Sequence, residues 1–238
     1  MIVQFRKDQP AIDLETSKSQ PQCRLLSLPA ELRNHIWQFI LVHNTKSAAL
    51  LPAHLFPGAP ASARKTSRFC ANVLLTCKQI NAEGTPILYG ENTFSAHSSL
   101  LASLPCFLLL ERPNKLLLGP VKSQRMQKLI RRYSLFLRLD TDPQFTKRLA
   151  EESFTGAEEL RIDVFQAMYA SSDFSVLRLF EGVRGIGKVN IDGSLGDGKY
   201  AEWLTNTMML PEGAETMPYS EQYVGGVKAW DSWTSGNR

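Results

Sequence analysis

Long apolar runs are absent from this sequence, which excludes an obvious membrane span. The richest apolar stretch, residues 100–110, is short and is interrupted by Pro105, whereas a membrane-spanning helix needs about 20 apolar residues. We therefore expect residues 100–110 to form a buried core helix. The first residues include Arg6, Lys7 and Asp8 and hold no long apolar run, so the sequence does not predict a secretory signal.

Cysteine and histidine are scarce. The four cysteines, Cys23, Cys70, Cys77 and Cys106, show no paired spacing. Without a secretory context they predict reduced thiols in a cytoplasmic or nuclear protein. The histidines are scattered and form no zinc-binding spacing with the cysteines. The sequence therefore predicts no metal site and no cofactor.

Motifs for covalent catalysis and nucleotide binding are also lacking. Ser194 lies in a glycine-rich turn but not in the Gly-x-Ser-x-Gly pattern of a serine nucleophile. Residues 182–188 match the Gly-x-x-x-x-Gly-Lys part of a phosphate-binding loop, but Val189 replaces the hydroxyl residue that holds magnesium. The expected order there, helix then loop then strand, is also the reverse of a phosphate cradle. We predict a protein with no catalytic residues, and an enzyme with an unfamiliar site is the alternative.

Enough apolar residues are present for a folded core, since 43% of the 238 residues are hydrophobic and 21% are charged. Residues 1–22 are polar and poorly periodic and predict a flexible arm. Residues 23–110 predict a helical module, with a long surface loop at residues 43–69 that is rich in Ala, Pro and Ser. Residues 111–210 predict a strand–helix body. The remaining tail, residues 211–238, is expected to fold back on the body or to bind a partner, because it carries four large aromatic residues: Tyr219, Tyr223, Trp230 and Trp233.

The first predicted helix begins near Pro29, where the missing N–H of proline costs nothing, and Glu31 lies near its positive end. We expect one apolar stripe on this helix to pack against a second helix. The stripe consists of Leu32, Ile36, Phe39 and Ile40.

The second predicted helix starts after Asn72, a suitable N-cap, and is interrupted at Gly84 and Pro86. Its apolar side consists of Val73, Leu74, Cys77 and Ile80. The apolar surface is expected to continue through residues 87–89 into a turn at residues 90–92, with Phe94 as an anchor.

The apolar period changes beyond residue 130. Apolar and polar residues alternate at 135–139, 160–164 and 189–191, which predicts three strands. Between them, residues 145–154 and 174–183 show helical patterns, and Gly156 and Gly185 are placed to end the helices. A further helix is predicted at residues 200–209, covering the last strand with Trp203, Leu204 and Met208.

The strand–helix pattern repeats. Leu135 to Leu160 is 25 positions and Leu160 to Val189 is 29, inside the range of about 20 to 29 residues of leucine-rich repeats. Residues 154–163 overlay residues 183–192 without gaps, so that a glycine, an isoleucine and an aspartate coincide. Strands joined through helices run parallel with right-handed crossovers. We expect a short parallel sheet with helices on at least one face.

Positive charge is concentrated in residues 112–132, although the net charge is only +4. The stretch contains seven cations, Arg112, Lys115, Lys122, Arg125, Lys128, Arg131 and Arg132. It could bind nucleic acid or an acidic protein partner. It could also be a solvated surface, since no aromatic residues interleave the charges.

Residues 24–94 resemble the F-box-like proteins that are abundant in filamentous fungi. Their opening reads Leu-Pro-x-Glu-Leu-Arg-Asn-x-Ile-Trp/Tyr, and residues 28–37 match it. Their second helix carries Thr-Cys-Arg-Gln-Ile, which residues 76–80 match with Lys78 in place of arginine. Leu88-Tyr89 and Asn92-Thr93-Phe94 follow, as is typical of the family. The region from residue 129 on also looks like the bodies attached to such openings. The implied fold class is mixed α and β, with an F-box-like helical module before a leucine-rich-repeat-like parallel sheet.

The resemblance implies a non-catalytic protein-interaction module, with the substrate receptor of a cullin-RING ubiquitin ligase as the role to expect. In F-box proteins the Leu-Pro-x-Glu helix docks on the ligase adaptor subunit, so the implied partner-binding residues are Leu28, Pro29, Glu31 and Leu32. Two alternatives stay open: a binder of nucleic acid or an acidic partner through residues 112–132, and a scaffold that has no ligase role and uses the module only for internal packing.

Overall fold

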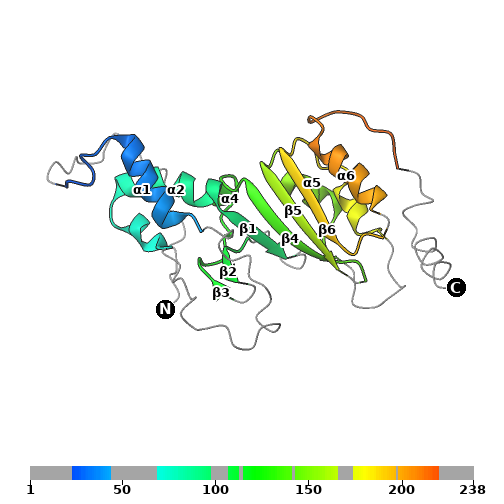
Figure 1. Ribbon diagram of the computed structural model, residues 1–238, viewed down its shortest axis with the longest axis horizontal. Helices are drawn as coiled ribbons and strands as arrows, with labels where there is room; N and C mark the ends of the chain where they lie inside the picture. The colour runs from blue at the N-terminus through cyan, green and yellow to red at the C-terminus, as the bar shows by residue number, and fades with distance from the viewer. Residues whose placement is uncertain are drawn as a thin grey trace. The chain divides into compact units, whose positions relative to one another are not determined.

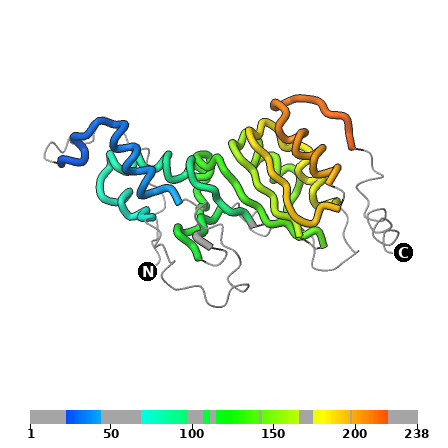
Figure 2. Tube along the Cα trace, viewed as in Figure 1, coloured from blue at the N-terminus to red at the C-terminus, as the bar shows by residue number. Residues whose placement is uncertain are grey.

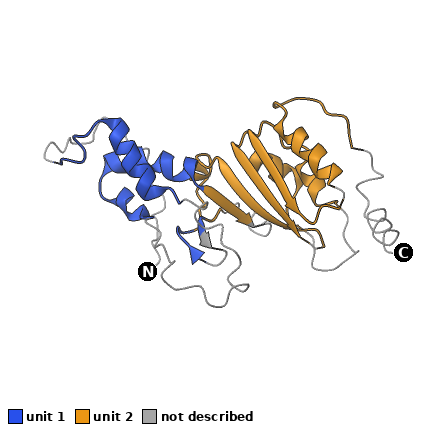
Figure 3. Ribbon diagram, viewed as in Figure 1, with its two compact units in different colours: residues 1–92, 109–119 blue, residues 93–108, 120–238 orange. Residues whose placement is uncertain are grey.

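The computed structural model describes residues 23–43, 69–97, 107–112, 115–140, 143–165, 174–196 and 198–219. The predicted arm at residues 1–22, nearly all of the predicted loop at residues 43–69, Cys106 and the tail aromatics Tyr223, Trp230 and Trp233 lie outside these residues. The chain forms two compact units (Figure 3). Unit 1 comprises residues 1–92 and 109–119, and unit 2 comprises residues 93–108 and 120–238.

Unit 1 is mainly helical. Its elements are helix α1 (Ala30–Leu41), the 3-10 helix η5 (Ala71–Leu75), helix α2 (Lys78–Glu91) and the antiparallel pair β2 (Leu110–Arg112) and β3 (Lys115–Leu116) (Figure 1). α2 packs against both α1 and η5. No helix in the described ranges of either unit has the length and apolar character to cross a membrane.

The predicted apolar stripe on α1 is wrong in part. Trp37 and Leu41 are fully buried, whereas Leu32 is 52% and Phe39 61% exposed. Ile36 and Ile40 are half-buried. The buried residues are four positions apart and so share one side of the helix, and a large indole there fills the space beside α2. Leu32 and Phe39 lie on another side.

The predicted second helix is in fact two helices. η5 ends before Cys77, whose Sγ accepts a hydrogen bond from the Ile80 amide (3.5 Å) and caps α2. Cys77 is thus a half-buried cap rather than a core residue. α2 also runs through Gly84 and Pro86 instead of being interrupted there. Gly84 is a close-packing position, since a Cβ on it would lie 2.5 Å from Leu74 Cδ2.

The predicted turn at residues 90–92 is also corrected. Residues 90 and 91 form the last turn of α2, and Asn92 is its C-cap. Phe94 is fully buried, as expected for an anchor, but it lies in a strand that the sequence pattern did not reveal.

Unit 2 contains a four-stranded parallel sheet. Its strands are β1 (Thr93–His97), β4 (Arg132–Arg138), β5 (Glu159–Phe165) and β6 (Lys188–Gly193), side by side in this order (Figure 1). The prediction of three parallel strands from alternating residues is confirmed, and β1 is an addition at one edge. The fold is therefore mixed α and β with a short parallel sheet.

The register of β5 and β6 is the one that the sequence overlay predicts, since Ile162 pairs with Ile191 and Asp163 with Asp192. For β4 and β5 the predicted spacing is two residues short: Leu135 pairs with Ile162, not with Leu160. A shift of two keeps the same face buried, so apolar alternation alone cannot distinguish these two registers.

Helices cover one face of the sheet. The chain runs from β4 through α5 (Lys147–Phe154) to β5, and from β5 through the 3-10 helix η6 (Leu177–Phe180) to β6 (Figure 2). After β6, α6 (Lys199–Met209) packs against the last strand. Right-handed crossovers in one direction place their helices on the same side, as Figure 1 shows. On this side lies an aromatic cluster that includes Tyr133, Phe154 and Phe180.

Two helix predictions in and near unit 2 are corrected. Within residues 100–110 the described part is extended, since residues 107 and 108 form β-bridges and β2 starts at residue 110. In residues 174–183 only the short η6 forms, which is enough to bury Phe174, Leu177 and Phe180.

The helices predicted at residues 145–154 and 200–209 are confirmed as α5 and α6, where Leu204 and Met208 are buried and Trp203 is half-buried. Gly156 and Gly185, which were predicted to end the helices at residues 145–154 and 174–183, have positive φ angles of +78° and +71°.

Gly193 ends β6 at a position that has no room for a side chain. Its φ is +112°, and a Cβ on it would lie 1.9 Å from the Val164 carbonyl oxygen. Because that obstacle is backbone of the neighbouring strand, Gly193→Ala is expected to lower the free energy of unfolding by about 2–3 kcal/mol, measured by urea denaturation. Gly198→Ala is the matched control, since φ there is +72° but, apart from its chain neighbours, no atom of the described residues would lie within 4 Å of a Cβ; its cost is expected near 1 kcal/mol. Equal losses at the two positions would contradict this explanation.

Candidate functional site

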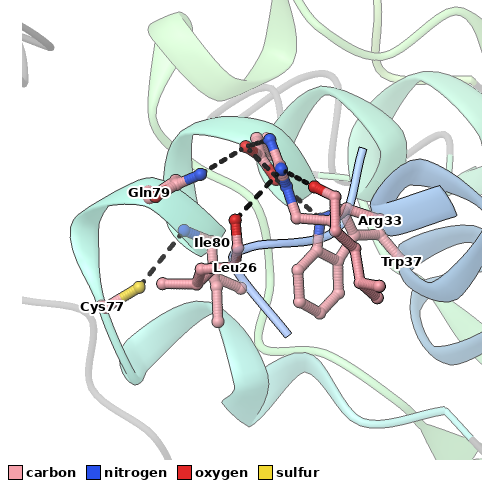
Figure 4. Close-up of polar contacts among 8 residues, drawn as sticks. Leu26, Arg33, Trp37, Cys77, Gln79 and Ile80 are labelled. Carbon is pink, nitrogen blue, oxygen red and sulfur yellow. Dashed lines mark hydrogen bonds and ion pairs between the residues drawn. The ribbon is translucent and has the colours of Figure 1, made fainter. Parts of the chain in front are cut away.

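The site that the resemblance implies lies at the start of α1, and a network of polar side chains between α1 and α2 holds this region. The Glu83 carboxylate on α2 is its centre. Arg33 Nη2 donates to Glu83 Oε1 at 2.7 Å and Arg33 Nε to Oε2 at 3.0 Å. Trp37 Nε1 donates to Oε2 at 3.0 Å, and Gln79 Nε2 to Oε1 at 3.0 Å (Figure 4). We call these four residues the Glu83 clamp.

Electrostatics keeps the Glu83 clamp charged. Its hydrogen bonds, first those from Arg33, lower the pKa of Glu83 to about 2, even though desolvation acts in the opposite direction. The same carboxylate raises the pKa of Arg33. The pair is largely shielded from solvent, with side-chain exposures of 13% for Arg33 and 22% for Glu83. A carboxylate with this pKa and with its lone pairs engaged is a poor general base near neutral pH.

The Arg33 guanidinium also holds the turn that precedes α1. Arg33 Nη1 donates to the carbonyl oxygen of Leu26 at 3.3 Å, and it donates to that of Leu28 as well. Backbone bonds from Leu26 and Ser27 to the Cys23 carbonyl close the same turn at 3.0 and 3.1 Å. One side chain therefore connects α2, α1 and the segment that carries Leu28.

A second polar residue joins the opposite ends of the two helices. The buried Asn92 side chain donates from Nδ2 to the carbonyl oxygens of Leu41 and Leu88, both at 2.8 Å. Its Oδ1 accepts from the His43 amide at 2.6 Å. A buried amide that makes all three bonds fixes the C-terminal ends of α1 and α2, so the two helices are attached at both ends.

The four residues predicted to bind a partner lie together at the start of α1. Leu28 is half-buried, and Pro29, Glu31 and Leu32 are exposed. Pro29 is the N-cap position and Glu31 lies in the first turn, as the sequence predicts. The structure thus brings these four residues together on one surface. Arg33 and Trp37, which belong to the Glu83 clamp, attach this part of α1 to α2.

The predicted basic stretch lies partly on α4 (Gln124–Gln127) and its flanks in unit 2. Lys122, Arg125 and Lys128 are exposed, and in the described parts of the chain no ion pair joins them to a carboxylate. Arg131 and Arg132 instead share Glu158, at 2.9 and 3.4 Å. Lys115 lies in unit 1, and the side chain of Arg112 is outside the description.

The described residues form neither a metal site nor a phosphate-binding loop. No group of three or more histidine, cysteine or acidic side chains there could hold a metal ion. In the segment that resembles a phosphate-binding loop, Lys188 Nζ contacts Glu159 at 3.2 Å, and the order is helix, loop and strand as predicted. Tyr219 packs against Tyr200 and Trp203, with ring centroids 5.2 and 5.4 Å apart, so the described part of the tail contacts the body.

The roles of Arg33 and Glu83 were not predicted from the sequence. A signal was present, because Arg33, Trp37 and Leu41 are four residues apart and share a helix face, which places a charged residue in line with two large apolar ones. Its partner, 50 residues away, could not be recognised from the local pattern.

Comparisons of this chain with models of protein families, with curated proteins and with solved structures find no match.

The Glu83 clamp predicts an acid-sensitive stability. Because the folded-state pKa of Glu83, about 2, lies below the ordinary value of 4.5, its contribution is present above about pH 4.5 and is lost as the pH falls towards 2. Glu83→Gln is expected to lower the free energy of unfolding by about 2 kcal/mol at pH 7, and the difference from wild type should shrink at pH 3. Urea denaturation at both pH values measures this.

Glu152→Gln serves as the control, since Glu152 pairs with Arg148 on the surface of α5, where the two side chains are 57% and 85% exposed. Its effect is expected to stay below about 0.5 kcal/mol. A Glu83→Gln loss that is no larger than this, or that is the same at pH 7 and pH 3, would contradict the assigned role of the clamp.

Proposed function

We propose that this chain is a non-catalytic protein-interaction module that docks, through Leu28, Pro29, Glu31 and Leu32, on the adaptor subunit of a cullin-RING ubiquitin ligase. The proposal rests on the resemblance of residues 24–94 to F-box-like proteins. The observation that carries it is the exposure of Leu32, 52%, on a helix whose opposite side is fully buried at Trp37. An exposed leucine on a helix that is fixed against its neighbour is suited to insertion into an apolar groove on a partner.

The shape of the proposed docking surface supports this function. Leu32 and Glu31 are adjacent at the first turn of α1, and Leu28 precedes them in the turn held by Arg33. Because the Glu83 clamp fixes this turn before any partner arrives, little conformational entropy remains to be lost on binding. Leu32 offers a partner apolar area to bury, and the adjacent Glu31 carboxylate can fix the orientation of that partner through a polar contact.

Unit 2 is proposed as the part that holds a substrate, in a leucine-rich-repeat-like arrangement. Two features support it. Leu135 pairs with Ile162 and Ile162 with Ile191, steps of 27 and 29 residues along the chain. The helices also lie on one side of the sheet, so the residues that alternate with its core residues face outward, among them Phe136 and Phe165, which are 49% and 43% exposed. Solenoid repeats commonly bind partners through a face of this kind, on which no described helix lies.

Binding of the purified chain to a purified ligase adaptor subunit tests the docking proposal. Leu32→Asp should raise the dissociation constant at least about tenfold, equivalent to about 1.4 kcal/mol, because it places a charge in an apolar contact. Biolayer interferometry with the wild type and the variant measures the ratio. Far-ultraviolet circular dichroism checks that the variant is folded.

The matched control is Leu75→Asp, since Leu75 is also an exposed leucine of unit 1, at 59%, but lies on η5. It should leave adaptor binding unchanged. No binding by the wild type, or equal losses in the two variants, would refute the docking proposal. The same titration at 50 and 500 mM salt separates the alternative function, because binding through the cations of residues 112–132 would weaken strongly with salt.

A further inference from the structure

β6 is an edge strand with an open outer side. It is the last strand in the sheet order, and among the described strands it pairs with β5 alone. No backbone hydrogen bond in the described ranges reaches the side of residues 188–192 that faces away from β5. Such a row of unpaired amides and carbonyls is a template for one more strand.

The described residues next to β6 leave this outer side clear at both ends of the strand. Before the strand, the Gly187 amide donates to the Ala157 carbonyl at 3.0 Å. After it, the Ser194 amide donates to the Val164 carbonyl at 3.0 Å. The residues that flank β6 are therefore hydrogen-bonded on the β5 side. Neither flanking residue crosses the outer edge of the strand.

The sequence of β6 is complementary to itself when reversed. With a second copy placed antiparallel and with Asn190 opposite Asn190, Lys188 lies opposite Asp192 of the other copy and Val189 lies opposite Ile191. Because of the two-fold symmetry each pair forms twice. Residues directly opposite in an antiparallel pair project to the same side with Cβ atoms about 4.5–5.5 Å apart, so both ion pairs would form on the uncovered face.

The charges next to β6 fit the same arrangement. Lys188 already contacts Glu159 on β5 at 3.2 Å, and Asp192 of the second copy would add an acidic group on its other side. Asp192 lies 3.8 Å from Arg161, so it would likewise stand between two cations. A parallel pairing in register would instead place Lys188 against Lys188 and Asp192 against Asp192, and like charges directly opposite are destabilising.

We propose that two copies of this chain associate through antiparallel pairing of their β6 strands about Asn190, which joins the two sheets into one continuous sheet. The association does not depend on the docking function proposed above. A ladder of five residues on each side is a small interface, and we expect a dissociation constant on the order of 10⁻⁵ M. The self-complementary charges then select antiparallel pairing over other arrangements of the edge.

Exchange of the paired charges tests this inference. Sedimentation velocity over about 1–500 µM protein, a range that brackets the expected dissociation constant, measures dimer formation by the full chain. Lys188→Asp alone creates two acidic contacts per dimer and Asp192→Lys alone creates two basic ones, so each should weaken the dimer at least about tenfold. The double exchange, Lys188→Asp with Asp192→Lys, restores opposite charges and should return the dissociation constant to within about threefold of wild type.

The double exchange also excludes an indirect effect, because it removes the contacts of Lys188 with Glu159 and of Asp192 with Arg161 within one copy. If those contacts decided the result, the double variant would be the weakest dimer of all, which would overturn the proposal. A wild type that stays monomeric over the whole range, or single exchanges without effect, would overturn it too. Arg148→Asp on the exposed surface of α5 is the control and should not change association.

Discussion

The Glu83 carboxylate is the interaction on which the helical unit depends. It receives hydrogen bonds from Arg33, Trp37 and Gln79, and so joins α1 to α2 at the end where α1 begins. Arg33 extends this connection to the carbonyl oxygens of the preceding turn. A charge in a largely shielded position is costly unless it is paired and hydrogen-bonded, and here the geometry that satisfies the charge is also the geometry that positions Leu28 and Leu32.

The sheet of unit 2 has one face buried under helices and one face that is more exposed. Parallel sheets are commonly covered by helices on both faces, but here the buried residues fall at every second position of β4 and β5. Leu160, Ile162 and Val164 are buried, while Arg161 and Phe165 between and beside them are exposed. Each crossover places its helix on the same side of the sheet. Only the strand residues that face this side are therefore buried, and they fall at every second position. Among the described residues, a face without helices and an edge strand at β6 are the consequences.

The sequence predicted the features that depend on local periodicity. Alternation located β4, β5 and β6, because a buried face requires an apolar residue at every second position. The overlay of Ile162 on Ile191 gave the register of β5 and β6, whereas the predicted spacing of β4 and β5 was two residues short. β1 was missed because it is short and directly follows the apolar end of α2. Which side of α1 is buried was predicted only in part, because the choice is decided by contacts of Trp37 and Arg33 with residues about 50 positions away. The place of the proposed docking residues came from motif resemblance, and their support by Glu83 came from the structure.

A double-mutant cycle between Arg33 and Glu83 tests the central claim most directly, which is that this pair holds the start of α1. The free energies of unfolding of the wild type, Arg33→Met, Glu83→Gln and the double variant would be measured by urea denaturation at pH 7. The account predicts a coupling of at least about 2 kcal/mol, with the second substitution costing little once the first is made. Losses that add within about 0.5 kcal/mol would contradict it.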